Sequence, residues 1–196
     1  SEVGRLSAVL IHTPANEVEN MTPGSASDVL YDDILSLPLA SREHHQLTEV
    51  LSRVCEVFQL KDLLQDVLGS EVVRIEVLSA LTDLYRCHEY QADLMELPVP
   101  ELASQLIEGT RKKPSSLARF LDPSPYVMPP LPNAFFTRDA VMCLNDGVII
   151  GSMAYPARVA ESILLRAIFR HHPKLKAERF FFDGTSNRSD EITIEG

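Results

Sequence analysis

The sequence predicts a mixed α+β protein in which two small α/β units lie on either side of a run of helices. Short aliphatic and β-branched runs, typical of buried strands, occur before residue 61 and again after residue 133. Between them, leucine recurs every three or four residues, which is the spacing of one helix face. The 196 residues are 45% hydrophobic and 23% charged, a composition that suits a folded domain and excludes a disordered chain.

The first α/β unit is expected over residues 1–60. Residues 6–12 (LSAVLIH) predict a buried strand that stops before Pro14. A turn-rich stretch follows, and residues 39–51 predict a helix that starts near Ser41. Residues 55–60 predict a second strand, so the order of strand, loop, helix and strand describes one α/β module.

Residues 61–120 are expected to form an all-helical insert. Apolar residues recur at helical spacing around positions 60–68 and 94–106, and Gly69, Pro98, Pro100 and Gly109 divide the stretch into several amphipathic helices. Residues 111–116 (RKKPSS) predict an exposed loop, because three charges are too few for a basic binding patch.

The second α/β unit is expected over residues 133–196, after a connection at residues 121–132. Prolines at 123, 125, 129, 130 and 132 predict that this connection is stiff and irregular. The unit that follows is ββαβ-like, with strands expected at 134–142, 148–150, 179–183 and 190–196, a hairpin turn at 145–147, and a helix from Pro156 to His172. Two such units predict a repeat architecture interrupted by the helical insert.

Charge and cysteine content restrict the class of protein. The formal net charge of −10 argues against a nucleic-acid binder, whose affinity would depend on Lys and Arg contacts to phosphates. Three widely spaced cysteines fit a reducing compartment, and neither a signal-peptide pattern nor a membrane-spanning apolar run is present, so a cytoplasmic protein is expected. The sequence holds no metal-binding cluster, phosphate-cradling glycine loop or dinucleotide fingerprint, so no cofactor is predicted.

Three charged residues stand out. Asp139 lies in a predicted apolar strand, where neighbouring Arg138 would point to the opposite face, so Asp139 either serves a site or caps a turn. Arg158 falls in the first turn of a predicted helix, where a cation opposes the helix dipole, so it is either a site residue or a surface arginine. Glu195 faces away from Ile192 and Ile194 and, taken alone, would be solvent-facing.

The segments around these residues resemble the arginine deiminases. The likeness rests on Asn133–Asp139 (NAFFTRD), Tyr155–Arg158 (YPAR) and Ile194–Gly196 (IEG), supported by Ser1–Leu6 and Leu30–Ile34. It runs through the whole chain in order and matches the N-terminal part of those enzymes. They belong to the guanidino-group-modifying, or pentein, superfamily, so the resemblance implies a partial α/β propeller with about two of five ββαβ modules and the helical insert.

The resemblance also implies a role for each site residue. Asp139 and Glu195 match the two carboxylates that hold the substrate guanidinium, whose planar fork of donors suits paired carboxylates. Asn133 and Arg158 match residues that bind the amino-acid end of L-arginine, and Arg158 faces its carboxylate. Phe136 matches an aromatic residue that packs on the substrate side chain, which requires the predicted strand to be bent or partly loop, since strict alternation turns Phe136 away from Asp139.

The same comparison implies an incomplete catalytic apparatus. In arginine deiminases a cysteine attacks the guanidinium carbon, ammonia leaves, and a histidine assists hydrolysis of the covalent intermediate to citrulline. Those groups come from modules beyond the segment where this chain ends, and Cys55, Cys87 and Cys143 do not match the nucleophile. His171 and His172 at a helix end are no substitute for the base. The expectation is a hydrolase by family that is inactive alone, with L-arginine as ligand and a homo-oligomer or complementing C-terminal fragment as partners.

Two other functions stay open at this point. One is a non-catalytic arginine-binding or assembly module that uses the helical insert and the open edge of the propeller. The other is a different member of the superfamily, acting on agmatine, methylated arginine or an amidino donor. A carboxylate-binding Arg158 favours arginine over agmatine, because agmatine has no carboxylate.

Overall fold

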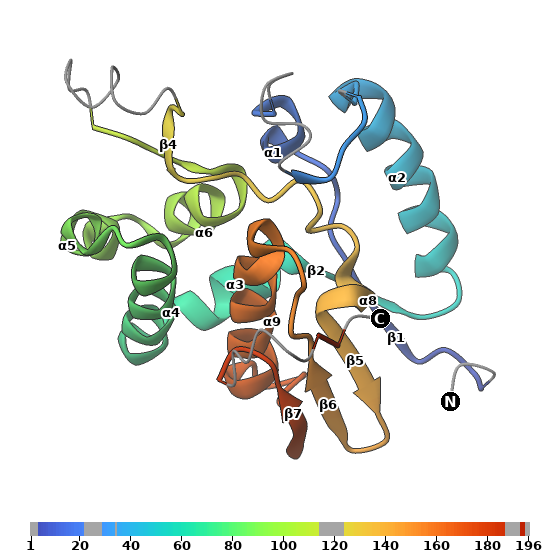
Figure 1. Ribbon diagram of the computed structural model, residues 1–196. Coiled ribbons are helices and arrows are strands. Elements are labelled where there is room, and N and C mark those ends of the chain that lie inside the picture. The colour runs from blue at the N-terminus through green and yellow to red at the C-terminus, as the bar shows by residue number, and fades with distance from the viewer. Residues whose placement is uncertain (1–3, 22–28, 34, 114–123, 187–192, 195–196) are drawn as a thin grey trace.

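A computed structural model of the chain describes residues 4–21, 29–33, 35–113, 124–186 and 193–194. It is a mixed α+β structure, as predicted, and its three small sheets are open rather than closed within these residues. Figure 1 shows the helices of residues 71–108 on one side and the helix of residues 37–52 on the opposite side, with the helix of residues 159–171 between them, beside the hairpin of residues 141–150.

The strands and helix expected in the first unit are confirmed. β1 (Ala8–Ile11) and β2 (Glu56–Gln59) pair in parallel, with Ala8 opposite Glu56. α2 (Leu37–Ser52) connects them and begins at Leu37 rather than near Ser41, because Pro38 supplies a first-turn residue that needs no amide donor. In the described part of the turn-rich stretch between β1 and α2, residues 16–19 form the short helix α1 (Asn16–Glu19).

The helices expected after residue 60 are also confirmed. They are α3 (Leu60–Leu68), α4 (Glu71–Tyr85), the short 3₁₀ turn η2 (His88–Tyr90), α5 (Gln91–Glu96) and α6 (Val99–Glu108). α3 ends before Gly69 and α6 before Gly109, as the sequence indicated. Gly109 has φ +101°, a backbone conformation that favours glycine and ends the helix.

Two short strands replace part of the expected loop and connection. β3 (Thr110–Arg111) pairs antiparallel with β4 (Tyr126–Met128). The prediction of a loop at 111–116 is therefore wrong for Arg111, and the prediction of an irregular connection at 121–132 is wrong for residues 126–128. The prolines at 125, 129 and 130 flank β4 and leave its own residues free to donate to the ladder. The loop residues 114–116 lie outside the described residues.

The strand expected at 134–142 is wrong for residues 134–140. Only Val141 and Met142 of this range lie in a strand, β5 (Val141–Leu144), and Asp139 lies in a helical turn, α8 (Thr137–Ala140). Successive turns satisfy the backbone instead of a ladder: Ala134 N donates to Leu131 O at 3.0 Å, and Phe136 N donates to Asn133 O at 2.9 Å. The segment is therefore folded back on itself, as a site role for Phe136 requires.

The remainder of the second unit follows the ββαβ order. β5 and β6 (Gly147–Ile150) form the expected hairpin, with Asn145 at φ +50° in its turn. The 3₁₀ turn η3 (Pro156–Arg158) and α9 (Val159–His171) lead to β7 (Arg179–Asp183), which pairs in parallel with β6. Of the strand expected at 190–196 only residues 193–194 are described, and Ile194 forms an antiparallel bridge with Ser152.

One apolar core joins the helices to the second unit. Its buried members come from α3, α4 and α6 together with α9 and β6, and include Leu64, Leu78, Leu102, Ile150 and Leu164. A polar network closes one side of this core: Arg166 of α9 donates to Asp183 Oδ2 at 2.7 Å and to Glu76 Oε1 at 3.0 Å. The network fixes α9 against both α4 and β7.

Asp183 makes the stability of the protein dependent on pH. Burial alone would raise the pKa of Asp183, but hydrogen bonds from Thr185 and Arg166 outweigh it and lower the pKa below its ordinary value of 3.8. The carboxylate therefore contributes stability above about pH 4 that is lost as the pH falls further.

We expect Asp183→Asn to lower the free energy of unfolding by about 2 kcal/mol near neutral pH, and the difference from wild type to shrink below about pH 4 in urea titrations. A difference that stays constant with pH would contradict this, and Asp146→Asn at an exposed ion pair is the control.

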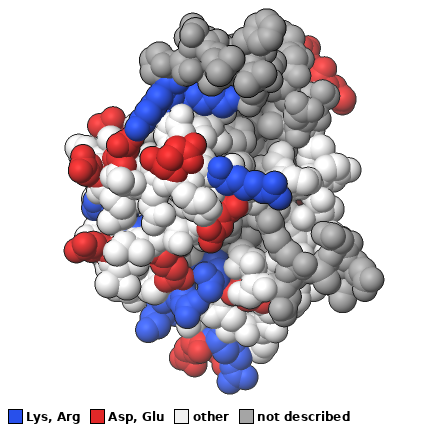
Figure 2. All heavy atoms as spheres, turned by 60° about the vertical axis from the view of Figure 1, so that its left-hand side comes forward, with Lys and Arg blue, Asp and Glu red and all other residues white. Residues whose placement is uncertain are grey.

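Charges on the helical face are interspersed. Figure 2 shows acidic side chains scattered among uncharged and basic ones on the side that carries α4 and α5. In the part of the chain that the structure describes, no helix is both long and apolar enough to cross a membrane.

Candidate functional site

The folded-back segment 131–139 is fixed in place by the first unit. Tyr31 Oη donates to Pro132 O at 3.0 Å, Asn133 Nδ2 donates to Val29 O at 2.8 Å, and Thr137 Oγ1 donates to Leu10 O at 3.1 Å. All three bonds join residues at least a hundred positions apart in the chain. The two units therefore meet at this segment, and each contributes groups to its surroundings.

Arg158 is the centre of the site. It is only 6% exposed, which rules out a surface arginine. Its Nε–Nη2 edge faces the Glu161 carboxylate, with Nη2 at 2.8 Å from Oε2, and its Nη1 donates to Asp139 Oδ2 at 2.6 Å. The unfavourable position of a cation at a helix start is thus offset by two carboxylates.

Burial and charge shift the pKa values of two groups here. Burial alone would lower the pKa of Arg158, but the bonds to Glu161 and Asp139 raise it above its ordinary value, so Arg158 stays charged. The pKa of Tyr31 is raised to about 12, first by burial and then by the negative charge of Glu161. Tyr31 is therefore a neutral hydroxyl that donates a hydrogen bond throughout the physiological pH range.

Three of the five predicted site residues come together. Asp139 and Arg158 are bonded to each other, and the Phe136 ring lies 5.9 Å from the Arg158 Cζ atom while being 47% exposed. Asn133 lies in the same segment, but it is buried and its amide nitrogen is used by Val29. Glu195 lies outside the described residues; its neighbour Ile194 pairs with Ser152.

Glu161, whose carboxylate accepts hydrogen bonds from Nε and Nη2 of Arg158, was not predicted from the sequence. It is 4% exposed and stands three positions after Arg158 in α9. The spacing of three is the usual distance between paired residues on a helix, and this was the available signal.

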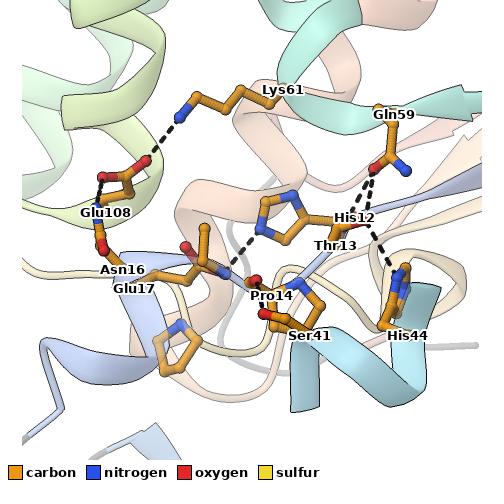
Figure 3. Close-up of polar contacts among 12 residues, drawn as sticks. His12, Thr13, Pro14, Asn16, Glu17, Ser41, His44, Gln59, Lys61 and Glu108 are labelled. Atoms are coloured by element: carbon orange, nitrogen blue, oxygen red, sulfur yellow. Dashed lines mark hydrogen bonds and ion pairs between the residues drawn. The ribbon is translucent and has the colours of Figure 1, made fainter. Parts of the chain in front are cut away.

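A second group of polar residues was also missed, at the carboxyl ends of β1 and β2. His12 and Glu17 form a buried pair, with His12 Nε2 at 3.0 Å from Glu17 Oε1 (Figure 3). Beside them Thr13 donates from its backbone and its hydroxyl to Gln59 Oε1, at 3.2 and 3.3 Å. His44 contacts the Thr13 hydroxyl, and burial, followed by the charge of His12, lowers its pKa.

Among the residues that the structure describes, no group of three or more His, Cys, Asp and Glu side chains could hold a metal ion. The carboxylates of Asp139 and Glu161 are instead directed at a guanidinium, the planar cation that such oxygens bind in pairs. Chemically, the arrangement suits recognition of a guanidinium and a carboxylate.

Gly184, directly after β7, lies against the backbone of Gly151 and Ser152, which follow β6. A Cβ atom at this position would lie 2.5 Å from both Gly151 O and Ser152 N, which are backbone atoms and cannot rotate away. We expect Gly184→Ala to lower the free energy of unfolding by about 3 kcal/mol in urea titrations. Gly69→Ala is the matched control, because its Cβ would lie at an ordinary 3.4 Å from Asp66 O. Equal effects of the two substitutions would contradict the proposed close contact.

Comparison with known proteins identifies the family of the chain. The family model described as arginine deiminase matches residues 27–196. The chain is 32% identical to the arginine deiminase of Limosilactobacillus fermentum over all of its own length and 51% of that protein, and 36% identical to that of Rhodococcus opacus over 91% and 48%. It thus spans about half the length of the curated relatives it matches. On this evidence the chain belongs to the arginine deiminase family.

Proposed function

We propose that this chain is the substrate-recognition half of an arginine deiminase. In the whole protein the reaction would be hydrolysis of L-arginine to citrulline and ammonia through a cysteine-bound amidino intermediate. Asp139 and Glu195 would hold the guanidinium, Arg158 and Asn133 the amino-acid end, and Phe136 the side chain of the substrate. The proposed fold of the whole is a five-module α/β propeller, with modules at 1–60 and 133–196, an insert at 61–120 and a connection at 121–132.

One observation carries the proposal. The carboxylate of Asp139 already holds a guanidinium, that of Arg158, at 2.6 Å in a site whose backbone is fixed by the first unit. A substrate guanidinium has the same planar geometry and charge, so it would find the same acceptor. The exposed ring of Phe136 lies beside this acceptor, in a position to cover the aliphatic part of a ligand.

Arginine is favoured over the alternative guanidino substrates by Arg158. A buried arginine whose charge is secured by two carboxylates is a suitable receptor for a ligand carboxylate, which agmatine lacks. We therefore expect L-arginine to bind at least tenfold more tightly than agmatine, since one charged hydrogen bond contributes about 1.5–3 kcal/mol.

The test separates binding from turnover. Calorimetric titration of the 196-residue chain with L-arginine should give saturable binding, and the chain alone should release no citrulline or ammonia. Addition of the C-terminal half of a relative should restore citrulline formation if the two halves complement each other. Binding without any restored turnover would favour a non-catalytic arginine-binding module, and the absence of arginine binding would overturn the proposal.

A further inference from the structure

The clearest feature that the proposed roles leave unexplained is Glu161. Its side chain is 3% exposed and lies against the Nε–Nη2 edge of Arg158, with Nε at 3.2 and 3.1 Å from its two oxygens and Nη2 at 2.8 Å. Asp139, by contrast, is 29% exposed at its side chain and contacts only Nη1 of the same guanidinium. The two carboxylates are therefore not equivalent partners of Arg158.

We propose that Glu161 is a positioning residue that holds Arg158 by one edge so that its other edge can exchange partners. In the ligand-free state Nη1 of Arg158 binds Asp139. When a guanidino acid binds, the guanidinium of the ligand pairs with Asp139, and the carboxylate of the ligand pairs with Nη1 of Arg158. The exchange breaks one ion pair and forms two, while the bonds to Glu161 persist. This inference rests on the proposed function for the identity of the ligand, but not for the arrangement of the residues.

Burial explains why Glu161 is the fixed partner. A carboxylate with almost no exposure loses a large part of its hydration, so its release from Arg158 would leave an uncompensated buried charge. Asp139 is partly hydrated and can exchange one cation for another at lower cost. Their places in the chain add to this asymmetry, because Arg158 is the residue directly before α9 and Glu161 lies three positions later in its first turn.

A further contact limits the rotation of the guanidinium. Arg158 Nη2 also donates to Phe136 O at 3.4 Å, and the Phe136 ring lies 5.9 Å from Cζ. Glu161 on one side and the Phe136 backbone on the other thus define the plane in which Nη1 points. A ligand carboxylate would approach in this plane, next to the ring that is proposed to cover the ligand side chain.

The first experiment needs no ligand. In spectra of ¹⁵N-arginine-labelled protein, the Arg158 Nε–H should exchange slowly with solvent in wild type and in Asp139→Asn. Exchange should become at least tenfold faster in Glu161→Gln, with partial protection retained in Glu161→Asp, which keeps the charge. Glu49→Gln, at an exposed position of α2, is the matched control. Slow exchange in Glu161→Gln, or equal loss in Asp139→Asn, would overturn the proposal.

The second experiment measures the consequence for binding. Calorimetric titration with L-arginine and agmatine should show that Glu161→Gln reduces the preference for L-arginine by about tenfold. A merely structural role would lower thermal stability and leave this ratio unchanged, which would contradict the proposal. If wild type binds neither ligand, the proposed function fails, whereas the exchange measurement still decides whether Glu161 positions Arg158. If Glu161→Gln does not fold, Glu161→Asp decides both measurements: intermediate values support the role and wild-type values oppose it.

Discussion

Replacing Asp139 by asparagine is expected to lower the affinity of the chain for L-arginine by about a hundredfold. The substitution keeps the shape of the side chain but removes the negative charge that would pair with the guanidinium, and a charged hydrogen bond contributes about 1.5–3 kcal/mol. The α8 turn that carries Asp139 uses backbone bonds, so the local fold should persist. Calorimetric titration with L-arginine measures the effect.

The same variant should act differently on a ligand that has a carboxylate but no guanidinium. The substituted amide would no longer hold Arg158 Nη1 as an ion pair, which leaves that group available to a carboxylate such as that of L-norvaline. We expect the weak affinity for L-norvaline to stay constant or to rise in Asp139→Asn. Asp146→Asn, at an exposed ion pair with Arg179, should change neither affinity. Parallel loss of both ligands would indicate a collapsed site and contradict the assigned role.

Most helices and strands could be predicted from the sequence because their hydrophobic periodicity is strong. α3 buries residues 60, 63, 64, 67 and 68, which is the spacing that predicted it. The expected strand at 134–142 failed because an apolar run does not distinguish a strand from consecutive turns. What decides the structure there is tertiary: hydrogen bonds from Thr137 to Leu10 and from Tyr31 to Pro132 hold the turns in place.

The candidate site was predictable in part, because two of its residues are unusual for their local sequence. Asp139 and Arg158 each broke a local rule, since one is a carboxylate in an apolar segment and the other a cation at a helix start. Their mutual pairing was not predictable, because Asp139 lies in a helical turn rather than in the expected strand, and nothing local joins residues nineteen positions apart. His12 and Glu17 carried no signal, because the irregular connection between β1 and α1 brings them together and no spacing rule describes it.

Replacing His12 by alanine is expected to destabilise the protein strongly. His12 is 2% and Glu17 1% exposed, Glu17 Oε1 accepts from His12 and from Ala15 N, and Glu17 Oε2 has no partner among the described residues. Loss of the imidazole would leave this carboxylate buried without its side-chain partner. We expect the free energy of unfolding, measured by urea titration with circular dichroism, to fall by about 3 kcal/mol.

Two further variants distinguish the contribution of the His12–Glu17 interaction from the cost of removing side-chain volume. Glu17→Gln keeps an oxygen acceptor for His12 and Ala15 and removes the buried charge, so it should cost about 1 kcal/mol or less. In a double-mutant cycle, His12→Ala and Glu17→Ala should couple by at least about 1.5 kcal/mol, because each removes the other's partner. His88→Ala, at an exposed contact with Asp83, should change stability by less than about 0.5 kcal/mol. Additive effects at His12 and Glu17 would show that the two side chains stabilise the protein independently, and the buried pair would then contribute only as packing.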